Sequence, residues 1–187
     1  MTESMVLLLE RVSKAFLAKS ELGLREAAND AIAQAAFEND SKKAEIAVIS
    51  YSLGKLLSKA HFQRSKNWPR VADSILREIN EAVSLARSDE FGLLEKKLSS
   101  VVSTVAKVDF EFGNYWQNLI EKARVKQASS AYALGLSLSQ ACGLTCCDKQ
   151  ALFNYIGFTK MHEETPVLKN ISERVDRLKE LLAEKKP

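Results

Sequence analysis

Apolar residues recur every three or four positions along most of the chain, and no stretch alternates steadily between apolar and polar residues. A repeat near 3.6 residues puts an apolar stripe on one face of a helix, whereas a half-buried strand repeats every two residues. The pattern therefore predicts an all-α protein, folded as an antiparallel helical bundle of about seven to eight helices. Only seven glycines and three prolines occur among 187 residues, which leaves little material for hairpin turns.

Interruptions of the apolar pattern set the expected helix boundaries. Asn39, Asp40 and Ser41 stop one helix and offer an N-cap to the next, and Gly113 with Asn114 breaks the pattern later. The expected helices cover residues 3–19, 22–37, 41–60, 69–86, 91–112, 115–142, 148–156 and a last segment from 165 onward. The segment 115–142 is the longest and becomes rich in alanine, so we expect it to be the long buried central helix. We find no internal repeat or linker, which predicts a single helical domain over residues 1–187.

The segment 91–112 has the most regular spacing in the chain. Its apolar residues follow alternating steps of three and four, the spacing of a coiled-coil seam. They are Phe91, Leu94, Leu98, Val101, Val105, Val108 and Phe112. Such a seam packs inside a bundle or forms a dimer interface. On the expected helix 115–142, Ala131, Gly135 and Ser139 form a ridge of small residues, which lets another helix approach closely. Both features motivate self-association or a protein partner.

Basic side chains are concentrated in one segment. The net charge of +3 is too small to indicate nucleic-acid binding from the total alone. However, no acidic residue lies between Glu45 and Asp73, and the segment 55–70 interleaves basic with aromatic side chains. The candidate residues for binding a nucleic acid or another phosphate-bearing ligand are Lys55, Lys59, His61, Arg64, Lys66, Trp68 and Arg70.

Two interpretations of the segment 55–70 remain open. Cations around an exposed aromatic ring can hold phosphates while a base stacks on the ring, here that of Trp68. If Asn67 caps the helix that begins at Pro69, the helix N-terminus adds partial positive charge at the same place. Alternatively, the basic side chains cover a solvated face, and Phe62 and Trp68 are hydrophobic lids on the end of the bundle. The polar stretch 61–67 is expected to be a connector.

All three cysteines, Cys142, Cys146 and Cys147, lie within six positions at an expected corner between two helices. Gly143 is expected to close the first of these helices in a left-handed turn. A small, inert thiol suits such a crowded corner. A redox role would need the next helix N-terminus to lower the pKa of Cys147. A metal site would combine Cys142, either Cys146 or Cys147, and His162, which makes three ligands where zinc takes four. We therefore expect packing, with no bound metal or cofactor.

The sequence contains no motif that carries catalysis by itself. The two histidines fall in neither Glu-x-x-His nor His-Glu-x-x-His, and the glycines form no nucleotide-binding loop. The cysteine corner resembles a helix-turn-helix, but Lys149 is the only basic residue of its second helix, which disfavours major-groove binding. An enzyme is therefore not supported.

Neither apolar run of the chain is typical of a targeting or membrane segment. The run at 5–9 is too short for a signal peptide, and the uncharged stretch 127–147 is rich in alanine and polar residues. We expect a cytoplasmic protein with no membrane contact. As its function, we expect a non-enzymatic helical interaction protein, either a homodimer or a subunit of a complex. The alternative is nucleic-acid or phosphate-ligand binding through the segment 55–70.

Overall fold

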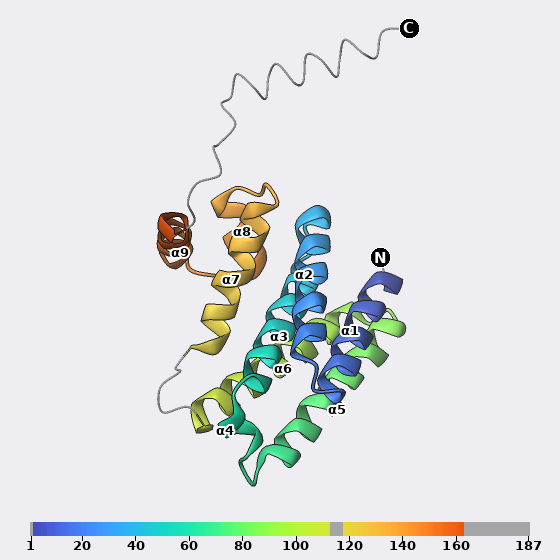
Figure 1. The fold of residues 1–187 in the computed structure, drawn as a ribbon. Coiled ribbons are helices and arrows are strands. Elements are labelled where there is room, and N and C mark those ends of the chain that lie inside the picture. Colours follow the sequence, from blue (N-terminus) through green and yellow to red (C-terminus); the bar gives the residue numbers. More distant parts are fainter. Residues whose placement is uncertain (1, 113–117, 163–187) are drawn as a thin grey trace, which may run out of the picture. The chain divides into compact units, whose positions relative to one another are not determined.

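The computed structural model describes residues 2–112 and 118–162, and every element of secondary structure in these residues is an α-helix (Figure 1). The helices are α1 (Thr2–Leu17), α2 (Glu21–Glu38), α3 (Ser41–Leu57), α4 (Ala60–Gln63), α5 (Trp68–Arg87), α6 (Phe91–Phe112), α7 (Leu119–Ala133), α8 (Leu138–Thr145) and α9 (Lys149–His162). Within this described part, α4 is a single turn and the other eight helices are longer. The predicted all-α bundle of seven to eight helices is therefore confirmed. The last helix, expected from residue 165, lies outside the described residues.

The chain divides into two units, Met1–Phe153 and Asn154–Pro187. The first unit contains helices α1 to α8 together with the beginning of α9. In the second unit, the described residues are 154–162, which form the rest of α9. A single domain over residues 1–187 stays a prediction. The site and the proposals below concern the first unit.

The central helix of the first unit is α3. Eleven of its 17 residues are buried, and they lie on all sides of the helix. Helices α1, α2, α6, α7 and α8 all pack against it. A helix that is apolar around its whole circumference is stable only when other elements cover every face. The bundle is therefore built around α3, which begins at a cap formed by Asp40, whose carboxylate accepts a hydrogen bond from the Lys42 backbone N–H at 2.9 Å.

The expected long helix over residues 115–142 is wrong, because the chain breaks between α7 and α8. Gly135 lies in this break with φ of +107°, a conformation that favours glycine. Ser137 then starts α8 in a capping box: its hydroxyl accepts from the Gln140 N–H, and the Gln140 side chain accepts from the Ser137 N–H. The uncharged stretch 127–147 is thus divided over two helices. None of the helices in the described part of the chain has the length and hydropathy that crossing a membrane requires.

The heptad seam of α6 faces the interior of its own bundle. Its members Leu94, Leu98, Val101, Val105 and Val108 are all buried, and α6 packs on α5 and α3. The side chain of Phe112 lies outside the described residues. The seam is therefore intramolecular over the residues that the structure describes.

The small-residue ridge predicted on residues 115–142 is not continuous. Ala131 is buried on α7, Gly135 lies in the turn that follows, and Ser139 is exposed on α8. These three residues therefore offer no single face on which another helix could pack.

Candidate functional site

The basic segment 55–70 passes through three helices at one end of the bundle. Lys55 lies in the last turn of α3, Arg64 and Lys66 lie between α4 and α5, and Arg70 lies in the first turn of α5. All four side chains are exposed. The expected connector therefore contains the helical turn α4, and the side chains of His61 and Phe62 within it lie outside the described residues. Because the end of α3, α4 and the start of α5 follow one another in the chain, these four cations lie at the same end of the bundle.

Trp68 does not offer its ring to a base in this arrangement. Only 5% of the residue is exposed, and its ring meets that of Phe16 edge-on, with 6.5 Å between the ring centroids. Asn67 precedes the helix, but its side chain makes no capping hydrogen bond. Pro69 occupies the first turn, where its missing N–H costs nothing. Trp68 thus lies as a lid that anchors the start of α5 on α1.

A shallow cavity of about 380 Å³ lies between the start of α5 and the end of α6. Arg70 and Ser74 line it from α5, and Thr104 and Lys107 line it from α6. None of the described residues that line it is acidic. The structure thus adds Lys107 to the basic residues that the sequence indicated. The sequence pattern identifies Lys107 only as an exposed position of α6. Whether Lys107 lines the same cavity as Arg70 depends on how the two helices pack, which the pattern does not give.

Further lysine side chains lie near the C-terminal end of α3. Burial lowers the pKa of Lys59, the nearby Asp109 carboxylate opposes this change, and the positive charges of Lys122 and Lys55 lower the pKa further. Asp109 is almost fully buried and accepts a hydrogen bond from the Leu119 N–H at 3.1 Å, which fixes the start of α7. Lys59 thus lies near one buried carboxylate and two further cations, Lys55 of α3 and Lys122 of α7, so positive charge is in excess around it.

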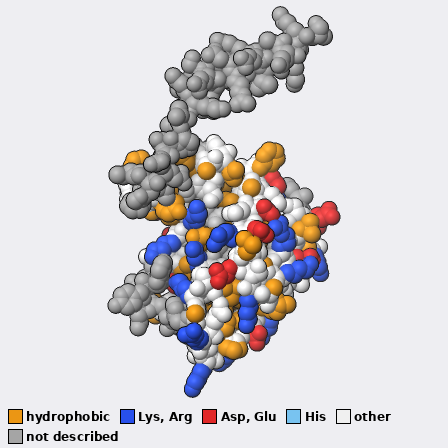
Figure 2. All heavy atoms as spheres, viewed as in Figure 1, with side chains coloured by type: hydrophobic (Ala, Val, Ile, Leu, Met, Phe, Trp, Pro, Cys, Tyr) orange, Lys and Arg blue, Asp and Glu red, His pale blue; other side chains and the backbone are white. Residues whose placement is uncertain are grey.

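The surface reflects this excess of cations. In Figure 2, Lys and Arg side chains are spread over the visible face, and several of them lie toward its lower left, near the end of the bundle where α4 and α5 meet in Figure 1. We call the exposed residues Lys55, Arg64, Lys66, Arg70 and Lys107 the cationic surface. Their charges attract anions, and a polyanion in particular gains from contacting several of them at once.

A larger cavity of about 660 Å³ lies elsewhere, between α6, α7 and the end of α8. Its polar lining includes Asp109, Glu121 and Arg124. The guanidinium of Arg124 already donates a hydrogen bond to the Thr145 carbonyl at 2.8 Å and so holds the C-terminus of α8. Asp109 is likewise engaged by the Leu119 N–H. Asp109 and Arg124 thus each hold a helix end, and we assign no ligand to this cavity.

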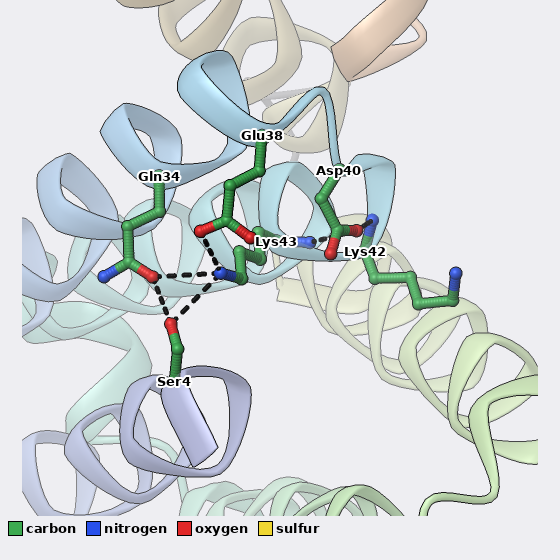
Figure 3. Close-up of polar contacts among 6 residues, drawn as sticks. All are labelled: Ser4, Gln34, Glu38, Asp40, Lys42 and Lys43. Carbon is green, nitrogen blue, oxygen red and sulfur yellow. Dashed lines mark hydrogen bonds and ion pairs between the residues drawn. The ribbon is translucent and has the colours of Figure 1, made fainter. Parts of the chain in front are cut away.

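A buried lysine network joins the first three helices (Figure 3). Lys43 on α3 is fully buried, and its ammonium donates to Ser4 Oγ of α1 at 3.0 Å and to Gln34 Oε1 of α2 at 3.2 Å. Its third donation goes to Glu38 Oε1 at 2.6 Å. Ser4 Oγ in turn donates to Gln34 Oε1. An ammonium has three N–H donors, so all of them are used within this network.

The Lys43 network connects the three helices and is not a ligand-binding site, because the ammonium has no N–H group left to donate to a ligand. Sequence analysis did not identify it, although a signal exists. Lys43 falls on the same helical stripe as Ile46, Ser50 and Leu53, all of which are buried. A charged residue within an apolar stripe indicates a buried charge that needs partners from other helices.

The three cysteines occupy the C-terminal end of α8 and the turn beyond it. Cys146 adopts the left-handed conformation that ends the helix, with φ of 54°. Gly143 lies within α8, so its predicted role as the terminating residue is wrong. The Cys147 N–H donates to the Cys142 carbonyl at 3.2 Å, which is the 6→1 hydrogen bond of a Schellman motif. That motif brings the side chains of Cys142 and Cys147 together, with 3.1 Å between their sulfurs.

The structure does not show the lowered Cys147 pKa that a redox role through a helix N-terminus would need. Burial, together with the hydrogen bond to Cys142, raises the pKa of the Cys147 thiol to about 12. Cys142 is buried and Cys146 is exposed. Among the described residues, no group of three or more His, Cys, Asp or Glu side chains is arranged to hold a metal ion. The side chain of His162, the fourth candidate ligand, lies outside the described residues.

Comparison with known proteins gives no identification. No protein family matches the chain, and neither a curated protein nor a solved structure matches it significantly. The function therefore has to be argued from the geometry of the described residues. The features available for that argument are the cationic surface and the cysteine corner.

Proposed function

We propose that the protein binds a phosphate-bearing polyanion, such as a nucleic-acid backbone, through the cationic surface. The observation that carries this proposal is the cavity between α5 and α6, into which Arg70 and Lys107 bring positive charge from two helices. Lys55, Arg64 and Lys66 extend the positive charge along the same end of the bundle. Phosphate oxygens accept hydrogen bonds from arginine and lysine, and Ser74 in the cavity offers a hydroxyl donor.

Binding of this kind is independent of sequence. Trp68 is buried against Phe16, so its ring is not placed for base stacking. Affinity then comes from neutralising phosphates and releasing counterions, so the logarithm of the binding constant falls with the logarithm of salt concentration. The slope is about −0.9 for each phosphate contact on duplex DNA. A surface of this size is expected to give a slope of about −3 to −4.

The test is a salt titration of binding to fluorescent duplex DNA and to single-stranded RNA. The double variant Arg70→Ala with Lys107→Ala is expected to weaken binding to both and to reduce the slope by about 2, because two phosphate contacts are lost. The matched control is Arg87→Ala with Lys96→Ala, which removes the same charge from exposed positions near the end of α5 and the start of α6, outside the cationic surface. Equal effects of the two double variants, or no binding at low salt, would refute the proposal.

The second candidate function is that of a non-enzymatic helical interaction protein. A small apolar groove of about 210 Å³ lies between the end of α1 and the start of α5, lined by Leu17, Pro69 and Leu76 among others. Leu17 is 69% exposed there. A partner helix, or the same surface of a second copy, would cover this groove and so bury the exposed leucine.

The two functions respond differently to salt and to substitution. Burial of apolar area is not weakened by salt, whereas phosphate contacts are. Light scattering over a concentration series measures self-association directly. The interaction function predicts association that persists at high salt and is lost in Leu17→Glu. A protein that stays monomeric and in which Leu17→Glu changes no partner binding would count against it.

A further inference from the structure

The sulfurs of Cys142 and Cys147 are held together by the backbone that ends α8. In a Schellman motif, the residue two places beyond the last helical one contacts a residue in the final helical turn. Here these two positions are filled by Cys147 and Cys142, and the residue between them in the left-handed conformation is Cys146. The sulfurs are 3.1 Å apart, and the Cys147 thiol donates to Cys142 Sγ. Both thiols are free in this structure.

We propose that Cys142 and Cys147 form a reversible intramolecular disulfide, and that low-molecular-weight disulfides are the oxidants that form it. A disulfide needs its two sulfurs about 2.05 Å apart, so closure requires the thiols to approach by only about 1 Å. The motif itself holds the two side chains in contact, and a folded chain in this state needs no rearrangement of helices to close the bond. The corner is therefore a modification site as well as a packing site.

The reaction is two successive thiol–disulfide exchanges. The Cys147 thiolate attacks one sulfur of the small disulfide, whose S–S bond breaks and releases one small thiolate. Cys142, after losing its proton, attacks Cys147 Sγ and releases the second small thiolate. The two protein thiols are oxidised to one disulfide, the small disulfide is reduced to two thiols, and the two protons end on these thiols.

The order of attack follows from accessibility. Cys147 is partly exposed, whereas Cys142 is 5% exposed, so an oxidant from solvent meets Cys147 first. Cys146 is exposed, but its Sγ lies 3.9 Å from the Gly143 carbonyl on its own helical turn. Cys146 is therefore the thiol that stays reduced after Cys142 and Cys147 have formed their disulfide. Because the raised pKa of Cys147 keeps most of this thiol protonated at neutral pH, exchange is slow there and faster in mild alkali.

Closing the bond fixes the corner between α8 and the start of α9. The covalent loop contains only residues 142–147, so it restrains the local turn and leaves the rest of the bundle unchanged. Within this loop lies Thr145, whose carbonyl accepts the hydrogen bond from Arg124 of α7. The disulfide is thus expected to hold the α7–α8 contact in place and to slow local opening of the corner.

The experiment uses the full-length Cys146→Ser variant, which retains only the proposed pair, because the exposed Cys146 can be replaced without filling or emptying the core. The folded protein is incubated at pH 8.5 with a mixture of oxidised and reduced glutathione, quenched with acid and analysed for free thiols and mass. We expect both thiols to be lost, the mass to fall by two hydrogens, no glutathione to remain attached and the protein to stay monomeric on non-reducing gels.

Two controls separate proximity in the fold from ordinary thiol reactivity. The same variant in concentrated urea is expected to form the disulfide with an equilibrium constant at least about tenfold lower, because the Schellman turn no longer holds the thiols together. Adding Cys142→Ser to the variant is expected to trap a stable glutathione adduct on Cys147. Retention of both thiols, stable double adducts, disulfide-linked dimers or equal constants with and without urea would each overturn the proposal.

Discussion

The Glu38 carboxylate lies 2.6 Å from the ammonium of Lys43, and it is the only carboxylate among the described residues that pairs with this fully buried cation. The Glu38 side chain is 30% exposed, so the pair connects the interior of the bundle with its surface. A buried charge without its counterion is costly, whereas a carboxylate near the surface can be hydrated. The two partners therefore differ in what their removal does.

We expect Glu38→Ala to destabilise the protein by about 3–5 kcal/mol, because it leaves the buried Lys43 ammonium without a countercharge. Lys43→Met should cost less, since methionine fills similar volume and Glu38 can turn to water. Adding Lys43→Met to Glu38→Ala should restore part of the lost stability. Urea unfolding of the two single variants and the double variant gives this comparison. Additive losses would contradict the predicted coupling.

Two glycines near α8 should respond to alanine in opposite directions. Gly135 has φ of +107°, where any other residue is strained, and Gly135→Ala should therefore destabilise the turn by about 1–2 kcal/mol. Gly143 lies inside α8, and a Cβ added there meets nothing within 4 Å. Gly143→Ala should stabilise the protein by up to about 1 kcal/mol. Thermal melts of both variants test the pair, and the same sign for both would refute the assignment of the break.

The left-handed conformation of Cys146 can be tested independently of redox chemistry. Glycine adopts this conformation without the steric cost that other residues incur. Cys146→Gly should therefore stabilise the reduced protein by about 1 kcal/mol, whereas Cys146→Ala should give no such gain. Melting under reducing conditions measures both. A gain with alanine equal to that with glycine would show that the thiol, and not the backbone, limits stability.

The partly buried Glu45 predicts a dependence of stability on pH. Burial raises the pKa of Glu45 from its ordinary value of 4.5, the charge of Arg124 opposes this, and the charge of Glu95 adds to it. A carboxyl with a raised folded pKa favours the folded state while protonated, and this contribution is lost as pH rises through the folded pKa. Glu45→Gln should therefore raise the free energy of unfolding at pH 7, and the gain should vanish in acid.

Urea unfolding at a series of pH values tests the Glu45 prediction. The control is Glu26→Gln, which removes a carboxylate from an exposed position on α2. This control should change stability little at any pH in the series. A gain for Glu45→Gln that is the same at pH 3 and pH 7 would show that the carboxyl is not perturbed as the structure indicates.

Most helix boundaries could be predicted because they depend on local chemistry. The expected segment 91–112 agrees with α6, and the cap at Asp40 starts α3 as predicted. The break between α7 and α8 was missed, although Ser137 and Gln140 have the spacing of a capping box. The alanine-rich pattern continues across this break, so periodicity alone extended the helix through it.

The candidate sites were less predictable because they depend on packing between distant segments. The sequence marks Arg70 as basic, but the approach of Lys107 follows from the way α6 lies on α5. The pairing of Cys142 with Cys147 similarly depends on which residue takes the left-handed conformation. Gly143 was the natural choice by propensity, but the structure places that conformation at Cys146, and this alone sets which thiols meet.

The central position of α3 has a consequence for the order of synthesis. Helices α1 and α2 precede it in the chain, whereas α6, α7 and α8, which cover its other faces, follow it by up to about a hundred residues. A ribosome adds about 5–20 residues per second, so α3 leaves the exit tunnel several seconds before its last partner is made. During that interval the nascent chain carries an apolar helix that is covered on one side only. We expect chaperones that bind exposed apolar segments to bind α3 during this interval.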